Sequence, residues 1–233
     1  MIKLLLLIAF SIILVFATIG SSRMEFDSGQ MGVLDDLFNS ENDTPICKRE
    51  TEIVKDCLEK YNETTPNFTS MSSSEFIGFV IQKSKYAMEC IGEIKCKKLA
   101  LAMFVLESGD YAMEKIHNGG QDCWNEENLQ TSIIKCAANE IKPDIFASRD
   151  PSLLFQFAKP IAKCAALQQV CDDVSKMQFL KGATAFGDAV EVAMTATYSL
   201  QQKNRSYIEN FNKKFNAADF DHLLNPTPCH SEL

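Results

Sequence analysis

The chain has 233 residues, 46% of them hydrophobic and 23% charged, and a formal net charge of −8 at pH 7. An acidic chain without a long basic run is a poor ligand for nucleic acid and for anionic lipid, so we expect neither as a partner. The length is enough for one sizeable core or two small ones.

The N-terminus has the layout of a secretory signal peptide. Lys3 supplies a positive charge, residues 4–19 form an almost entirely apolar run, and small residues follow at 20–22. The apolar run is shorter than the roughly 20 residues that a membrane-spanning helix needs. We therefore expect a signal peptide over residues 1–20, cleaved between 17 and 22, rather than an uncleaved anchor, and no membrane span in the mature chain.

The folded domain is expected to span residues 44–216. Residues 21–43 before it are acidic with little repeating pattern, which predicts a flexible lead-in. Thr44-Pro45 is a cap residue followed by proline, the pattern that opens a helix. Apolar residues then recur at helical spacing as far as Tyr61, so the first helix is expected there.

Helical spacing continues through the middle of the chain. A capping-box pattern at residues 72–75 predicts the start of the second helix, with a break near Gly92. The pattern that follows is expected to stop at Ser108-Gly109-Asp110, and a short stretch after it at Asn118-Gly119-Gly120. The next helix is expected from about Glu126 to Lys142.

The last third of the domain also has helical periodicity. Asp150-Pro151 repeats the cap-plus-proline start, and its stripe reaches Cys171 across Pro160, which should kink the helix or mark its true start. A long helical segment is expected from about Ala183 to Phe215, with a tail over residues 217–233. Because no alternating strand pattern occurs, the predicted fold is all-α: a disulfide-braced bundle of about six helices.

Nine cysteines indicate a disulfide framework in a secreted chain. There is no Cys-x-x-Cys and no cluster of histidines, so we expect no metal and no cofactor. The simplest pairing makes four bridges and leaves Cys229 over, as a free thiol or as an intermolecular link in a disulfide-linked dimer. The eight bridged residues would be Cys47, Cys57, Cys90, Cys96, Cys123, Cys136, Cys164 and Cys171. The sequence leaves roughly 100 pairings of these eight open.

Helix geometry excludes two pairings of near neighbours. On a single helix, Cys90 and Cys96 would lie ~9 Å apart along the axis, and Cys164 and Cys171 ~10.5 Å apart. A disulfide needs Cα atoms within about 7 Å of each other. We therefore expect Cys164 and Cys171 to bond different neighbouring segments.

Four Asn-x-Ser/Thr sequons predict N-glycosylation of a secreted chain. Asn62 and Asn67 lie in a polar loop, and Asn204 needs an exposed face of the last helical segment. Asn42 is the weakest candidate, because Thr44 of its sequon is also the expected cap of the first helix and a proline follows it directly.

The chain ends in a sequence similar to an endoplasmic-reticulum retrieval signal. Leu233 is preceded by Glu232, and His230 stands fourth from the end. Ser231 departs from the pattern, because a hydroxyl replaces the usual carboxylate and one charge-assisted contact is lost. We expect the protein to be secreted, and the lumen of the endoplasmic reticulum is the alternative.

Several cysteine-containing stretches resemble a secreted nematode family, the domain of unknown function nineteen. They run from Cys47-x9-Cys57 through "CIGEIKC", "YAMEKIHNGGQDCW" and "SIIKCAANEI" to "KPIAKCAALQQVC". The resemblance covers a little over half of the chain. It implies a secreted, cysteine-rich helical domain and no particular chemistry.

Catalytic signatures are not found. The mature chain has three histidines, and neither a Gly-x-Ser-x-Gly elbow nor a His-Glu-x-x-His pattern occurs. The histidines are His117, His222 and His230. We therefore expect a protein that is not an enzyme.

Four weaker patterns have simpler interpretations. The glycine spacing at residues 182–187 is that of a phosphate loop, but Asp188 stands where the lysine belongs and would repel phosphate, so we expect a helix start. We interpret residues 219–222 as solvated side chains rather than a metal site, and Asp172-Asp173 as an exposed helix face. Trp124 is expected to pack in the core against a bridge.

Two functions then compete. One is a protein-interaction module of unknown partner. The alternative is a carrier of a small apolar ligand such as a fatty acid, since the chain has 16 Phe and 9 Met. The first is favoured because periodicity places these residues where any core would be.

Overall fold

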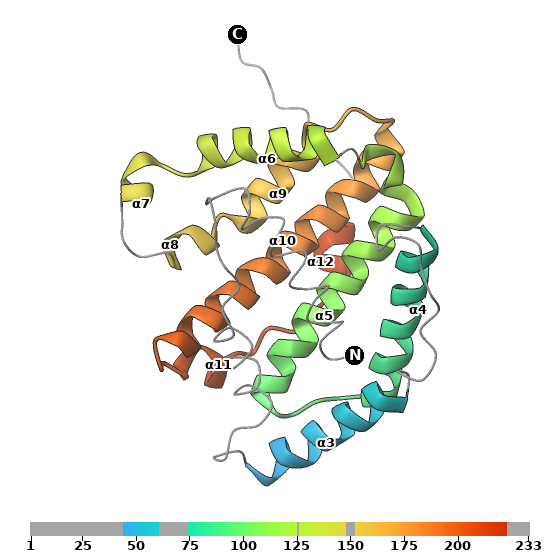
Figure 1. Cartoon of the computed structure of the whole chain (residues 1–233), viewed down its shortest axis with the longest axis vertical. Helices are drawn as coiled ribbons and strands as arrows, with labels where there is room; N and C mark the ends of the chain where they lie inside the picture. The colour runs from blue at the N-terminus through green and yellow to red at the C-terminus, as the bar shows by residue number, and fades with distance from the viewer. Residues whose placement is uncertain (1–43, 61–73, 125, 148–151, 223–233) are drawn as a thin grey trace.

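The computed structural model of the protein describes residues 44–60, 74–124, 126–147 and 152–222 (Figure 1). All regular elements among them are helical, and six helices have ten residues or more, which confirms the predicted all-α bundle. These six are α3 (Pro45–Lys60), α4 (Ser74–Ile91), α5 (Lys97–Lys115), α6 (Glu126–Glu140), α9 (Ala158–Leu167) and α10 (Asp173–Gln201). The expected signal peptide and lead-in, the cap patterns at residues 72–73 and 150–151, and Cys229 lie outside the described residues.

Short helical elements connect the long ones. They are the π-helical turn η1 (Ile116–Gly120), the 3-10 turn η2 (Gln121–Cys123), α7 (Pro143–Ala147), α8 (Ser152–Phe155), α11 (Ser206–Glu209) and α12 (Ala218–Asp221). In Figure 1, α10 crosses the middle of the bundle between α5 and α9. Helix α6 packs on the far side of α9, and α4 and α3 pack beside α5. No helix of the described residues is long and apolar enough to cross a membrane.

Two interior glycines allow α10 to contact its neighbours backbone to backbone. A Cβ atom at Gly182 would lie 2.8 Å from the Ala112 carbonyl oxygen of α5, and one at Gly187 would lie 2.6 Å from the Lys159 Cα of α9. The expected helix start at this glycine pair is therefore wrong. Helix α10 begins at Asp173, nine residues earlier, and the glycines serve its packing rather than its termination.

Helix α5 continues through its predicted stop. Ser108 and Asp110 are 0% and 5% exposed, and both belong to one unbroken helix that ends at Lys115. Burial against the flanking helices overrides the turn preference of Ser-Gly-Asp. The next predicted stop is not a break either, because Gly119 and Gly120 form part of η1 and lie against Gln178 and Phe179 of α10.

The C-terminal part of the domain differs from the prediction in two ways. The helix expected as far as Phe215 ends at Gln201, where the chain reverses and Lys203 adopts a φ of 55°. The domain also continues past the expected boundary at 216, because α12 follows and its Phe220 is 3% exposed. Aromatic packing, which a search for long periodic segments does not detect, holds these last residues in the fold.

Three other boundaries agree with the sequence. Helix α3 starts at Thr44-Pro45, and Thr44 Oγ1 accepts a hydrogen bond from the Cys47 amide at 3.3 Å. Helix α4 ends at Ile91, and Gly92 takes a φ of 67°, which confirms the predicted break. Pro160 lies in the first turn of α9, near its true start.

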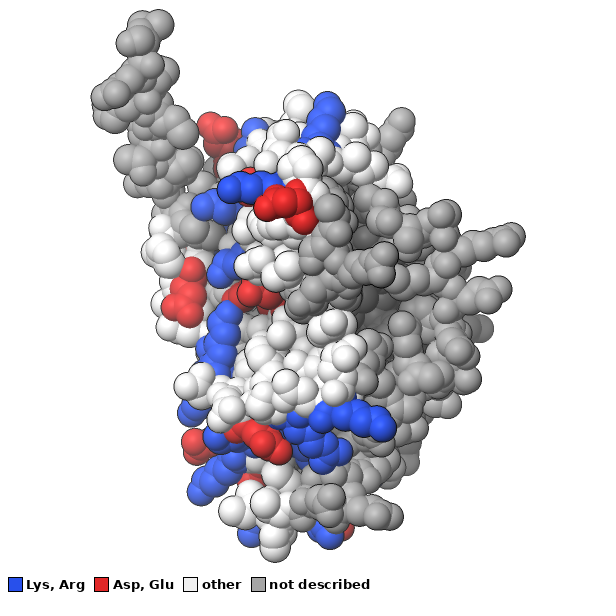
Figure 2. Space-filling view, turned by 90° about the vertical axis from the view of Figure 1, so that its left-hand side faces the viewer, with Lys and Arg blue, Asp and Glu red and all other residues white. Residues whose placement is uncertain are grey.

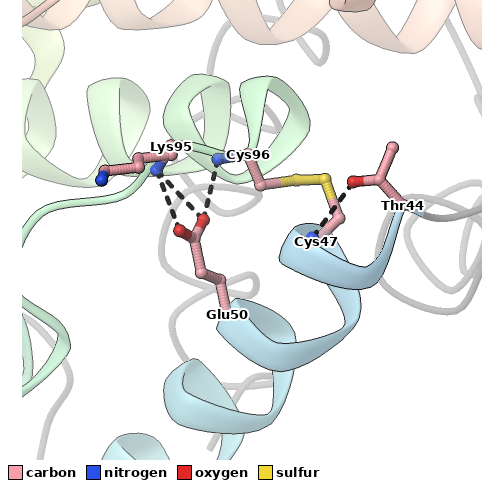
Figure 3. Close-up of a disulfide and its surroundings, with 5 residues drawn as sticks. All are labelled: Thr44, Cys47, Glu50, Lys95 and Cys96. Atoms are coloured by element: carbon pink, nitrogen blue, oxygen red, sulfur yellow. Dashed lines mark hydrogen bonds between the residues drawn. A yellow bond between two sulfur atoms is a disulfide. The ribbon is translucent and has the colours of Figure 1, made fainter.

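A buried carboxylate joins α3 to the start of α5 (Figure 3). Glu50 is 4% exposed and accepts hydrogen bonds from the amides of Lys95, at 3.0 and 3.2 Å, and Cys96, at 2.8 Å. Donors at the start of a helix have no partner within it, and the helix dipole favours a negative charge there. Glu50 thus positions α5 beside the disulfide of Cys47 and Cys96.

Candidate functional site

The structure pairs the eight expected cysteines into four disulfides. As predicted, Cys164 and Cys171 bond different segments, which are α6 and the end of η2. The bridges are Cys47–Cys96, Cys57–Cys90, Cys123–Cys171 and Cys136–Cys164. Two of them tie α3 to the segments that follow it, and two tie α9 and the loop after it to the middle of the chain.

One bridge holds two apolar side chains at the protein surface. Cys123 ends η2 and Cys171 lies in the loop between α9 and α10, with their Cα atoms 5.1 Å apart. Their chain neighbours Trp124 and Val170 are 50% and 90% exposed. The disulfide therefore places a tryptophan and a valine from distant parts of the sequence at the same end of the molecule, and we call this pair the apex.

The expectation that Trp124 packs in the core is only partly correct. Its ring meets Phe179 edge to face, with centroids 6.1 Å apart, so one side is anchored on the core. The other half of the side chain is exposed, because Trp124 follows the bridged cysteine directly and leaves η2 in an extended conformation. An anchored aromatic ring with an open face needs little further ordering before it binds a partner.

Three carboxylates lie next to the bridged cysteines of the apex in the chain. Asp122, Asp172 and Asp173 are exposed and adjoin the two bridged cysteines in the sequence. Asp172 accepts hydrogen bonds from the amides of Val174 and Ser175, both at 3.0 Å, and so caps α10. Hydrogen bonding with Ser175 holds the pKa of Asp172 below its usual value. The apex thus combines two exposed apolar side chains with three exposed carboxylates that are close to them in the chain.

A second polar arrangement lies between α4 and α5. Asp110 is 5% exposed, and its Oδ1 atom has no hydrogen-bond partner among the described residues. Burial raises the pKa of Asp110 to about 6, while Lys85 and a hydrogen bond with Ser84 oppose the shift. Lys85 also pairs with Glu114 at 2.7 Å. This carboxyl therefore changes its charge between neutral and mildly acidic pH.

Within residues 219–222, Asp221 binds neighbouring side chains of α5 and α10. Asp221 accepts a hydrogen bond from the Tyr111 hydroxyl at 2.8 Å and pairs with Lys115 and Lys181 at 3.5 and 3.6 Å. These contacts correct the interpretation of Asp221 as simply solvated. Over the described ranges, no group of histidine, cysteine or carboxylate side chains is arranged to hold a metal ion.

One predicted glycosylation site falls within the described residues. Asn204 is exposed in the turn after α10, and its Oδ1 atom accepts hydrogen bonds from the amide and hydroxyl of Ser206, at 3.0 and 2.7 Å. The turn thus presents the sequon to solvent, as the prediction requires. The other three sequons, Cys229 and the ending at residues 230–233 lie outside the described ranges.

Charge is mixed over the face that carries α6, α8 and α11. Figure 2 shows lysine and arginine interspersed with aspartate and glutamate there, with uncharged surface between them. Neither sign dominates this face.

Val170 was missed by the sequence reasoning. The only signal is a pair of valines, Val170 and Val174, on either side of Cys171-Asp172-Asp173. Valines beside a bridged cysteine are normally counted as core, and only the structure shows that Val170 is 90% exposed.

Comparison of the chain with protein-family models, curated proteins and solved structures finds no match. The resemblance to the nematode family therefore stays a prediction, based on the cysteine-containing stretches alone.

Proposed function

We propose that this protein is a secreted or secretory-pathway luminal interaction module, which binds another protein through the apex and has no catalytic activity of its own. Four disulfides in one domain suit an oxidising compartment. The signal-like N-terminus and the exposed sequon at Asn204 support the same location.

The apex is the observation that carries the proposal. Tryptophan is among the residues that contribute most to binding at protein interfaces, and an exposed apolar surface with a polar rim is typical of such sites. Trp124 and Val170 are fixed by a disulfide, and Trp124 also by Phe179. The exposed carboxylates beside the bridged cysteines favour a partner with an apolar pocket and positive charges near it, because complementary charges steer association and select the partner.

The packing around α10 gives less support to a carrier of a small apolar ligand. At Gly182 and Gly187 the neighbouring helices touch the backbone of α10, which leaves no space for a ligand at either crossing. Uptake of a fluorescent fatty acid by delipidated protein measures this function directly. Saturable uptake that Trp124→Ala leaves unchanged would favour the carrier over the interaction module.

A photoreactive phenylalanine derivative at position 124 tests the proposal in cells that secrete the protein. Tyr86 on α4 is the matched control, because it is also aromatic and 45% exposed. We expect a discrete adduct at position 124 that excess unlabelled protein removes, that Val170→Asp weakens, and that position 86 does not give. Identical adducts at both positions would contradict a site at the apex.

The compartment is tested by the mass of the secreted protein before and after reduction and glycosidase treatment. We expect a loss of mass at Asn204 with glycosidase and a gain of eight hydrogen atoms on reduction of four disulfides. Unmodified sequons together with nine free thiols would show that the chain does not pass through the secretory pathway.

A further inference from the structure

The four disulfides differ in how deeply their cysteines are buried. Cys90 on α4 is exposed, whereas the other seven bridged cysteines are buried or half-buried. Its partner Cys57 on α3 is 4% exposed and belongs to the apolar cluster that also contains Val54, Ala87 and Leu99. The bridge between Cys57 and Cys90 therefore has one end at the surface and the other end in the core.

This asymmetry selects the sulfur atom that an external thiol can reach. A disulfide is opened when a thiolate attacks one of its two sulfur atoms and the other sulfur leaves, so the rate depends on access to the attacked atom. Attack at Cys57 would require α3 and α4 to separate first. Attack at Cys90 requires no such movement, because this residue is already exposed in the folded protein.

Helix α4 depends on this bridge more than α3 does. Cys90 is the one cysteine of α4, whereas α3 is also tied to the start of α5 by the bridge from Cys47 to Cys96 and by Glu50. Helix α4 also packs over Asp110 of α5, whose Oδ1 atom has no hydrogen-bond partner among the described residues. An unpaired buried carboxylate oxygen costs free energy, and that cost opposes the packing of α4 on α5.

We propose that Cys90 is a thiol-exchange site, at which an external thiol such as glutathione opens the bridge to Cys57 and frees α4. The external thiolate bonds to the Cys90 sulfur, the bond between Cys57 and Cys90 breaks, and Cys57 leaves as a thiolate that takes up a proton. A second external thiol then attacks the mixed disulfide and releases Cys90. Two external thiols are thereby oxidised to one disulfide, and the two cysteines are reduced to thiols.

Opening the bridge changes the surface of the protein. Leu99 and Met103 of α5 are 1% and 8% exposed, and they belong to one cluster with Ala87 and Ile91 of α4. When α4 leaves, this apolar side of α5 becomes accessible. The exchange does not involve the apex, so the proposed partner site and the exchange site are tested independently of each other.

Graded treatment of the folded, full-length protein with reduced glutathione tests the exchange. The reaction is stopped with acid, free thiols are alkylated, and the modified cysteines are identified by peptide mass. We expect the bridge of Cys57 and Cys90 to open at least about tenfold faster than that of Cys136 and Cys164, with the glutathione adduct on Cys90. The second bridge is the control, because Cys136 is 0% exposed and Cys164 is half-buried. Equal rates, an adduct on Cys57, or no opening while the protein stays folded would overturn the proposal.

A pair of charge substitutions at Tyr86 tests the position of attack. Tyr86 is 45% exposed and precedes Cys90 by four residues, so the two lie on the same side of α4. Because glutathione is negatively charged, Tyr86→Lys should speed opening and Tyr86→Glu should slow it, each by about two- to fivefold at low salt. The thermal midpoints of both variants serve as the control for stability. Unchanged rates in both variants would show that the thiol does not attack at Cys90.

Hydrogen exchange measures the release of α4. Protein opened by glutathione and then alkylated at Cys57 and Cys90 is compared with untreated protein. We expect exchange in α4 to become at least about tenfold faster, with α10 still protected. Unchanged protection in α4 would overturn its release, and loss of protection in α10 as well would show that the whole domain unfolds instead.

Discussion

The two ends of α5 are held in the bundle by different means. Near its N-terminus, α3 and α4 are joined to each other and to α5 by two disulfides and by the buried carboxylate of Glu50. Towards its C-terminus, α5 meets α10 at Gly182, where backbone touches backbone, and α10 meets α9 in the same way at Gly187.

The difference shows how the peripheral helices α3 and α4 and the long central helix α10 are held in one domain by different interactions. Helix α10 has 29 residues and buries several faces against α5, α9 and the C-terminal segment, so apolar contact alone can hold it. Helices α3 and α4 lie at the edge of the bundle and pack mainly through one cluster with Val54, Ala87 and Leu99. Disulfides compensate for this smaller apolar contact. Removing one of them is therefore expected to destabilise mainly the helices that it joins.

The largest expected effect follows from removing the bridge between α3 and α4. Replacing Cys57 and Cys90 with serine should lower the free energy of unfolding by about 2–4 kcal/mol, because the unfolded chain regains freedom. Hydrogen exchange should show faster exchange in α3 and α4 while α10 stays protected. The control is replacement of Cys136 and Cys164, which tie α6 to α9. Loss of protection in α10 with the first pair would contradict the separation of the two regions.

The polar contact between α4 and α5 is expected to depend on pH. Because burial raises the pKa of Asp110 to about 6, the folded state keeps this proton between about pH 4 and 6 while the unfolded state loses it. Its contribution to stability is complete below pH 4 and is lost as the pH rises through 6, by up to about 3 kcal/mol.

Asp110→Asn should remove this dependence and make the protein more stable than the wild type at pH 7.5. The measurement is urea unfolding at several pH values, with the exposed Asp144→Asn as control. Wild-type and Asp110→Asn curves that stay parallel from pH 4 to 7 would show that Asp110 does not titrate in this range.

A matched pair of glycine substitutions tests the close packing of α10. Gly187→Ala should destabilise the protein by about 1–3 kcal/mol, because the new Cβ meets the Lys159 Cα and the Ala158 carbonyl, which cannot yield without moving α9. Gly109→Ala in α5 meets nothing within 4 Å and should stabilise by up to about 1 kcal/mol through helix propensity. Thermal unfolding measures both, and shifts of the same sign would contradict backbone contact at Gly187.

The smallest expected effect concerns the carboxylate in Figure 3. Glu50→Gln keeps the shape of the side chain but loses its charge, so the hydrogen bonds from the Lys95 and Cys96 amides weaken. We expect a loss of about 1–2 kcal/mol in urea unfolding. Glu52→Gln on the exposed side of α3 is the control and should be nearly neutral. Equal losses would show that the contact with α5 contributes nothing specific.

Local signals predicted some boundaries well and others poorly. Thr44-Pro45 and Gly92 were interpreted correctly, because a cap, a proline and a glycine with positive φ act within a few residues of themselves. Gly109 and the glycines at 182 and 187 were misread as ends or starts of helices. Their helical conformation depends on burial against other helices, which the sequence does not display.

The candidate site was predicted in part. The sequence identified Cys123 and Cys171 as bridged residues but left their partners open, and it placed Trp124 in the core. Exposure of Trp124 and Val170 depends on which two loops the disulfide brings together. That pairing is a long-range property, so no local pattern of residues contains it.

The sequence by itself determined the helical class, the disulfide framework and the acidic character of this protein. These follow from periodicity and composition, which act through local backbone geometry and through the number of charges. Only the tertiary structure decided which cysteines pair, that α10 lies at the centre, and which side chains remain exposed. Those outcomes depend on the close packing of helices distant in sequence, where a missing Cβ at Gly187 decides whether two backbones can meet.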